Sequence, residues 1–233
     1  MSASATTGRT GYAARLAVFS ALPLVAGLAV AQGLYGDPRW WQLPPLGRDA
    51  VAGMTVAANA AILLIMCAAA RPARRACYGV AMFIAISCGA AIVMSVRVPA
   101  AAWLSAHGML AVTACAVVAG RFLAGRLFRE PLDAAGLTVA VLAALTIGPL
   151  VPGPAAPPLP AWAIDAVLRL NPVVAVTSAA GMDLLHTSLF YRLAPVAHWQ
   201  FEYPGTAAST ALFGTTALLL AVIGRVLHHE PAA

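Results

Sequence analysis

The residues best suited to chemistry lie in the C-terminal half of the chain. Asp183 and His186 are three residues apart, and His198 and Glu202 are four residues apart. At helical spacing each pair falls on one helix face, and carboxylates together with imidazoles are ligands for zinc. The flanking residues match no metal signature such as H-E-x-x-H. We therefore interpret these four as polar residues of amphipathic helices and predict no metal, cofactor or catalytic group, with a metal site or hydrolytic centre as the alternative.

One histidine and the cysteines are the other candidates. His107 lies inside an apolar run, and no other such run contains the second histidine that a haem would need. We interpret it as a neutral, hydrogen-bonded side chain. None of the four cysteines forms a C-x-x-C pair, so buried free thiols are the prediction; Cys67 and Cys77 flank a short loop and are the alternative thiol or metal pair. The chain has neither a phosphate-binding G-x-x-x-x-G-K-[ST] loop nor a G-x-S-x-G elbow.

The elements that carry these residues are strongly apolar. Of 233 residues, 61% are hydrophobic and 9% are charged, against roughly a quarter charged in a soluble domain. That excess does not fit inside a soluble globule of this length, which needs a polar exterior. The composition excludes a soluble enzyme, a nucleic-acid module and a disordered regulator, and it indicates a polytopic membrane protein in contact with the lipid bilayer.

Six apolar segments are each about 20 residues long, the length that crosses a bilayer as a helix. They are apolar on all sides, whereas barrel strands alternate apolar and polar residues, so we predict an all-α protein. The whole chain, 1–233, is predicted to be a single transmembrane domain. The six predicted spans are 16–35, 51–70, 76–96, 101–120, 134–151 and 206–224.

The long connection before the last span, 152–205, is predicted to be a broken amphipathic or re-entrant segment. It begins with a proline-rich run and continues as an amphipathic helix that contains Trp162. Asn171 and Pro172 interrupt that helix, because a residue before proline is disfavoured in the helical conformation. The next apolar run, 173–185, is too short to cross a bilayer and is typical of re-entrant or interfacial segments. We expect two short helices on, or partly in, the outer leaflet.

The arginines predict the orientation, because cytoplasmic loops of membrane proteins collect positive charge. With the N-terminus inside, nine arginines fall on the cytoplasmic side and five on the other. We therefore predict that both termini are cytoplasmic and that 152–205 is extracytoplasmic. The alternative is that Met1–Ala31 is a cleaved signal peptide, which would leave five spans in the same orientation.

The layout, together with Leu-Pro-Ala-Trp at 159–162 and Leu-Asn-Pro at 170–172, resembles the ABC-2 type permeases. The layout covers nearly the whole chain, and the motif match is confined to 159–172. Members of this family usually have an acidic stretch and a coupling helix between the second and third spans, where this chain has only the basic loop 70–76.

The resemblance implies a compact or degenerate permease subunit of an exporter in the bacterial cytoplasmic (inner) membrane. Such a subunit is not itself an enzyme, pairs as a homo- or heterodimer, and works with a separate ATP-binding cassette subunit. The contacts with that ATPase would then fall on Arg71, Arg74 and Arg75. The alternatives are an accessory structural subunit of a larger membrane complex, and a metal- or cofactor-binding subunit of a membrane enzyme.

Overall fold

The computed structural model describes all or most of the second, third, fourth, fifth and sixth predicted spans, together with part of the segment 152–205. Within the described residues every regular element is an α-helix, as predicted. Most of the first predicted span, 16–35, lies outside the described residues. The described residues are 17–18, 21–25, 29, 45–70, 73–93, 99–147, 160–183, 202–203 and 205–227.

Seven helices have defined bounds: α2 (Pro45–Ala69), α3 (Ala73–Val93), α4 (Ala100–Leu127), α5 (Pro131–Ile147), α6 (Ala161–Leu170), α7 (Pro172–Ala179) and α9 (Thr206–Val226). Each predicted span from the second onward corresponds to one helix. The broken segment is also confirmed in outline, because two short helices, α6 and α7, precede α9.

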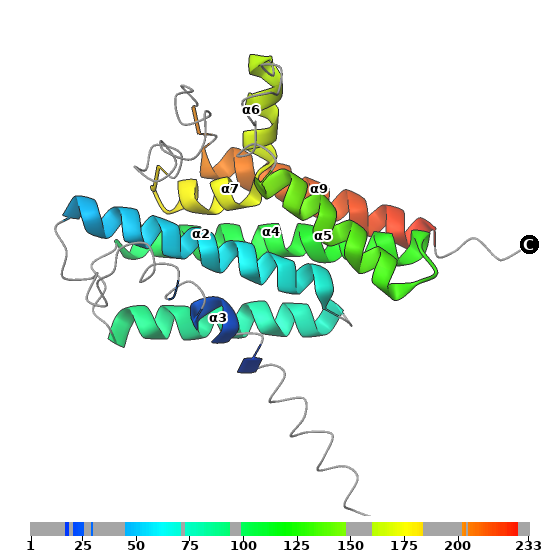
Figure 1. Ribbon diagram of the computed structural model, residues 1–233, viewed down its shortest axis with the longest axis horizontal. Helices are drawn as coiled ribbons and strands as arrows, with labels where there is room; N and C mark the ends of the chain where they lie inside the picture. The colour runs from blue at the N-terminus through cyan, green and yellow to red at the C-terminus, as the bar shows by residue number, and fades with distance from the viewer. Residues whose placement is uncertain are drawn as a thin grey trace, which may run out of the picture.

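Helix α4 is the centre of the bundle. Helices α2, α5, α7 and α9 pack against it, and α2 and α3 run alongside it (Figure 1). Helix α9 forms the most extensive helix pair with α4, and the two are parallel: Gly120 faces Leu220, and Phe122 faces Gly224. A Cβ atom at position 224 would lie 2.7 Å from the Phe122 ring, so the helices approach this closely because residue 224 is glycine.

Helix α4 is longer than predicted, because the predicted span ended at residue 120 and the helix ends at Leu127. The arginines that indicated a loop continue the helix instead. Arg121 is 6% exposed and donates from Nη2 to the carbonyl oxygen of Pro131, 3.1 Å away. The Arg126 guanidinium lies 4.9 Å above the Phe122 ring. Both charges are held by neighbouring groups, so they do not interrupt the helix.

The core lies where α2, α3, α4 and α7 meet. Its most buried large side chains include Leu63, Leu64, Phe83, Met109 and Val176, none more than 2% exposed. Helix α7 contributes to this core along its whole length, because every residue from Pro172 to Thr177 is buried. The second half of the broken segment is therefore part of the packed bundle.

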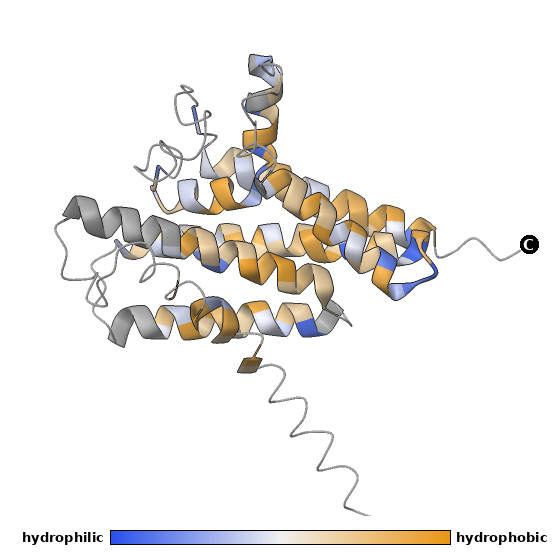
Figure 2. Ribbon diagram, viewed as in Figure 1, coloured by the Kyte–Doolittle hydropathy of each residue, from blue (hydrophilic) through white to orange (hydrophobic). Residues whose placement is uncertain are grey.

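Most of the described helices are rich in apolar residues (Figure 2), and many of the large apolar side chains are exposed. On α9 the side chains of Leu218, Leu219 and Val222 are 65%, 56% and 49% exposed. Among the described residues, two helices are long and apolar enough to cross a membrane, α4 and α9, and the apolar parts of α2, α3 and α5 are shorter. The arrangement with six spans remains a prediction.

Candidate functional site

The break between α6 and α7 is organised by one side chain. Asn171 is 2% exposed, and its Oδ1 accepts hydrogen bonds from the backbone N–H groups of Val173 (2.9 Å) and Val174 (3.2 Å). These are donors at the start of α7 that have no partner within the helix. The side-chain Nδ2 donates to the carbonyl oxygen of Thr146 on α5, 3.2 Å away. Asn171 thus caps α7 and joins it to α5, while Pro172 occupies the first helical position, where its missing N–H costs nothing.

Helix α6 projects from the bundle (Figure 1). Leu168 is 1% exposed at its inner end, whereas Trp162 near its start is 74% exposed. Asp165 accepts a hydrogen bond from Arg169 at 2.8 Å, in the i, i+4 pair typical of an exposed helix face. The predicted amphipathic character of this helix is confirmed, and its tryptophan lies far from the packed core.

A cavity of about 260 Å³ lies beside the break. Leu170 and Pro172 line it from the break itself, and side chains of α4, α5 and α9 line the rest. Three threonines are its polar lining residues, and each hydroxyl donates to a carbonyl of its own helix: Thr113 to Met109 and Leu110, Thr138 to Ala134, and Thr216 to Leu212. Since those donors are engaged, the cavity is suited to an apolar molecule.

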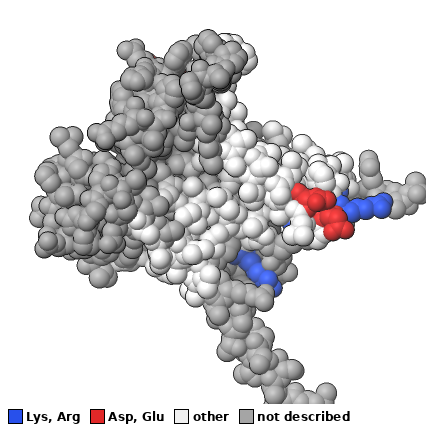
Figure 3. All heavy atoms as spheres, viewed as in Figure 1, with Lys and Arg blue, Asp and Glu red and all other residues white. Residues whose placement is uncertain are grey.

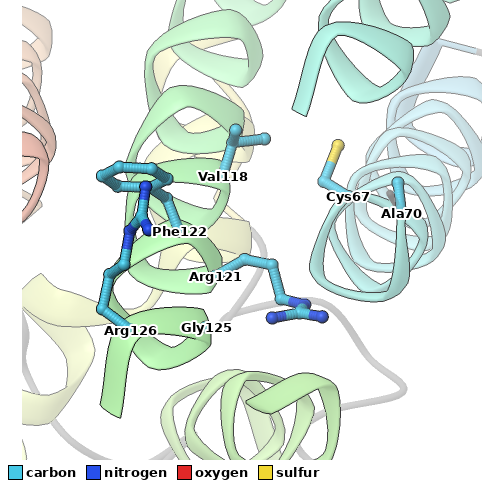
Figure 4. A pocket seen from close by; sticks show the side chains of 7 residues that line it. All are labelled: Cys67, Ala70, Val118, Arg121, Phe122, Gly125 and Arg126. Atoms are coloured by element: carbon cyan, nitrogen blue, oxygen red, sulfur yellow. The ribbon is translucent and has the colours of Figure 1, made fainter. Parts of the chain in front are cut away.

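A second cavity, of about 290 Å³, lies against the C-terminal turns of α4 (Figure 4), where its lining residues alternate along the helix with some of those that line the first cavity. Cys67 and Ala70 line it from the end of α2, and the last turns of α4 line it with Val118, Phe122, Gly125 and two arginines. The arginines are Arg121 and Arg126, and their guanidinium groups point to different sides of α4 in Figure 4. This cavity has a mixed lining with two cationic side chains, whereas the first cavity is almost entirely apolar.

Charge gathers at this same end of the bundle. Arg75 and Arg129 are exposed here, and Arg225 lies at the end of α9. In Figure 3 the visible charged side chains lie toward this end, and the described face beyond them is uncharged. The opposite end has Arg48 in the first turn of α2 and Arg169 on α6. The grouping of arginines predicted from the sequence is therefore observed for these residues.

His107 belongs to a buried polar cluster between α3 and α4. Its Nδ1 lies 2.8 Å from the carbonyl oxygen of Trp103, and its Nε2 lies 3.0 Å from Ser87 Oγ. The Trp103 ring is tilted against the imidazole, with 4.8 Å between centroids. The predicted hydrogen bonding of His107 is confirmed. The cluster lines a small cavity together with Asn59 of α2 and Val176 of α7.

The four predicted polar residues of 152–205 are described only in part. Asp183 is exposed and accepts a hydrogen bond from the Tyr203 hydroxyl at 2.6 Å, and Glu202 is exposed beside that tyrosine. His186 and His198 lie outside the described residues. Among the residues that the structure does describe, no group of three histidine, cysteine or acidic side chains is arranged to hold a metal ion.

The other predicted positions have different outcomes. Arg71 lies outside the described residues, Arg74 lies in the first turn of α3, and Arg75 is exposed one residue later. The loop predicted between the second and third spans is thus shorter than expected. All four cysteines are free, as predicted, but Cys67 alone is buried, and Cys77 and Cys115 are exposed. The prediction that all four thiols are buried is wrong. The apolar stretches of these helices include exposed faces, and Cys77 and Cys115 lie on such faces.

The sequence did not predict three buried polar residues of these sites. Asn59 is 8% exposed on α2, Ser87 is 4% exposed on α3, and Arg121 is 6% exposed on α4. The signal for Asn59 was its position as an amide inside an otherwise apolar run. Arg121 directly follows the apolar run 101–120, so the sequence predicts a loop there.

Comparison with known proteins gave no match. No family model, no curated protein and no solved structure corresponds to this chain.

Proposed function

We propose that this chain is a multi-pass protein of the bacterial cytoplasmic membrane and the permease subunit of an ABC-type exporter, working with a separate ATPase. The observation that carries the proposal is the broken helix α6–α7, whose second half is buried in the bundle beside an apolar cavity. The resemblance of 159–172 to the ABC-2 type permeases supports the same assignment.

The outer surface supports the membrane part of the proposal. Monomeric soluble proteins rarely present large contiguous apolar surfaces to water. Helix α9 exposes Leu218, Leu219, Val222 and Ile223 along one stretch, each at least 46% exposed. In a bilayer this face would lie against lipid, so exposing its apolar side chains would carry no free-energy cost.

The broken helix supports the transport part. In membrane transporters, discontinuous helices near the bilayer midplane form the substrate site, and irregular backbone at that depth is buried in protein. In this chain Asn171 occupies the N–H groups at the start of α7, so this half-helix does not offer them to an anion. The adjoining cavity is apolar, and the substrate class that fits it is a neutral molecule with a large apolar part.

The basic end supports the orientation and the site of the ATPase. Arg75 and Arg129 are exposed at the end where α4 and α9 terminate. By the positive-inside rule this end faces the cytoplasm. The ATPase would dock here, against the Arg74–Arg75 turn of α3, with two permease subunits forming a dimer.

The membrane assignment is tested with reporters fused after residue 128 and after residue 170. Alkaline phosphatase is active only outside the cytoplasm. Green fluorescent protein does not fluoresce after export through the general secretory route, so its fluorescence marks a cytoplasmic fusion point. We expect fluorescence at 128 and phosphatase activity at 170. A chain recovered in the soluble fraction, or the reversed reporter pattern, would contradict the assignment.

The permease assignment is tested by purifying the tagged chain from its native membranes in mild detergent. We expect a nucleotide-binding subunit and vanadate-sensitive ATP hydrolysis to co-purify. Arg75→Glu should reduce both at least tenfold, because it reverses the charge at the proposed contact. Arg169→Glu, at the opposite end, is the charge-reversal control. It breaks the exposed Asp165–Arg169 pair but lies away from the proposed ATPase contact, so it should leave both unchanged. Absence of ATPase from the wild-type preparation would favour an accessory structural subunit instead.

A further inference from the structure

The small cavity beside His107 is lined by residues of four helices. Asn59 of α2, Ser87 of α3, and Trp103 and His107 of α4 supply its polar lining, and Val176 of α7 is among the apolar residues that complete it. The cavity measures about 20 Å³. A cavity of roughly 10–15 Å³ or more holds one water molecule when polar partners surround it.

Two polar atoms of this lining have no hydrogen-bond partner within the described part of the chain. They are the Asn59 Oδ1, an acceptor, and the Trp103 Nε1, a donor, and both are inaccessible to solvent. Asn59 as a whole is 8% exposed. Leaving buried polar atoms without partners is unfavourable, and this is most severe where no solvent enters. The two residues that carry this acceptor and this donor therefore line the same cavity.

The hydrogen bonds of His107 determine whether Ser87 presents a donor or an acceptor to the cavity. The Trp103 carbonyl oxygen can only accept, so the imidazole proton lies on Nδ1. In the neutral imidazole Nε2 is then an acceptor, and the Ser87 hydroxyl donates to it. The lone pairs of Ser87 Oγ are left as a second acceptor at the cavity.

We propose that this cavity is a binding site for one water molecule that joins α2, α3 and α4. The water donates to Asn59 Oδ1 and to Ser87 Oγ, and it accepts from Trp103 Nε1. Three hydrogen bonds are the usual number for a buried water. A metal cation does not fit this lining, because the indole N–H is a donor, and a larger molecule does not fit the volume. The site is independent of the proposed transport function.

The test is a nuclear Overhauser measurement on the full chain in nanodiscs of deuterated lipid, with tryptophan labelled by ¹⁵N in the indole. The chain has five tryptophans, and Trp103→Phe identifies the relevant indole signal by its loss. We expect a cross-peak between the Trp103 indole proton and water, with the sign of a long-lived contact and the opposite sign in the rotating frame. Absence of this cross-peak, while other contacts of the same proton are visible, would overturn the proposal.

The Asn59→Leu variant distinguishes two origins of the cross-peak: a bound water molecule, and proton exchange through the Ser87 hydroxyl. The variant keeps Ser87 but removes one water partner, so the cross-peak should weaken at least threefold and the melting temperature should fall. If the cavity were dry, replacing an unsatisfied amide by a similarly sized apolar side chain would raise the melting temperature instead. Persistence of the full cross-peak in this variant would assign it to hydroxyl exchange and overturn the proposal.

Discussion

Replacing Asn171 by alanine should destabilise the bundle more than any other single change at the break. The change removes the acceptor of the Val173 and Val174 N–H groups, at 2.9 and 3.2 Å, and the donor to Thr146. A lost helix cap costs about 1 kcal/mol, and a buried group left without a partner costs about 1–3 kcal/mol. Because the site is 2% exposed, water cannot replace the missing side chain. We expect the free energy of unfolding to fall by about 2–4 kcal/mol.

Asn171→Ser is the matched variant that separates the contribution of the α7 cap from that of the hydrogen bond to Thr146. The serine hydroxyl can still cap α7, but it cannot reach the Thr146 carbonyl, so we expect a loss of about 1 kcal/mol. Trp162→Ala, on the 74% exposed start of α6, is the control and should change stability by less than about 0.5 kcal/mol.

The assay is reversible unfolding in mixed micelles of dodecyl maltoside and sodium dodecyl sulfate, followed by helical circular dichroism. An alanine variant within about 0.5 kcal/mol of wild type would refute the reasoning, since buried N–H groups should not lose their acceptor so cheaply. So would a serine variant as unstable as the alanine variant, because capping would then contribute nothing.

Two further predictions use the same unfolding assay. Gly224→Ala should lower stability by about 1–3 kcal/mol, because the new Cβ atom would lie 2.7 Å from the Phe122 ring. Gly214→Ala on the same helix has nothing within 4 Å of the new atom and should be neutral or stabilising; equal effects of the two changes would contradict the close α4–α9 packing. Phe83→Ala should cost about 3–5 kcal/mol because the ring is 1% exposed. Tyr78→Ala, 58% exposed on the same helix, should cost far less, and a comparable loss would argue against Phe83 as a core residue.

The positions of the helices could be predicted from apolar runs alone. The predicted span 206–224 and the observed α9 begin at the same residue, Thr206. The errors lie at the charged ends, where α4 continues past residue 120 and α3 already begins at Ala73. Hydropathy falls at an arginine, but helix propensity does not, because arginine is a good helix former whose long side chain reaches a distant partner.

The break before the last helix could also be located, because asparagine followed by proline disfavours a continuous helix. The depth of α7 in the bundle could not be predicted from the sequence. Residues 173–185 are equally apolar whether they lie at an interface or inside a bundle, and only packing against α2 and α4 distinguishes the two for α7. The sequence does not reveal that Asn171 bonds to Thr146, 25 residues earlier, since nothing local encodes that contact.

The polar cluster was predictable for one member only. His107 was identified as a hydrogen-bonded residue because an imidazole in an apolar run needs a partner. Its partner Ser87 and the facing Asn59 lie on two other helices. Their convergence depends on how α2, α3 and α4 rotate against one another, which a single sequence does not specify.

The pairing of α4 with α9 has a consequence for biogenesis. About a hundred residues separate the two partners along the chain, and α9 is the last described helix to leave the ribosome. The surface of α4 that receives it, including Gly120 and Phe122, must therefore wait uncovered while α5 to α7 are made. Translation arrested before Thr206 would yield a chain with every other described helix but no partner for that surface. In such a chain the surface of α4 that α9 covers would stay open, and completion of the bundle depends on the final helix.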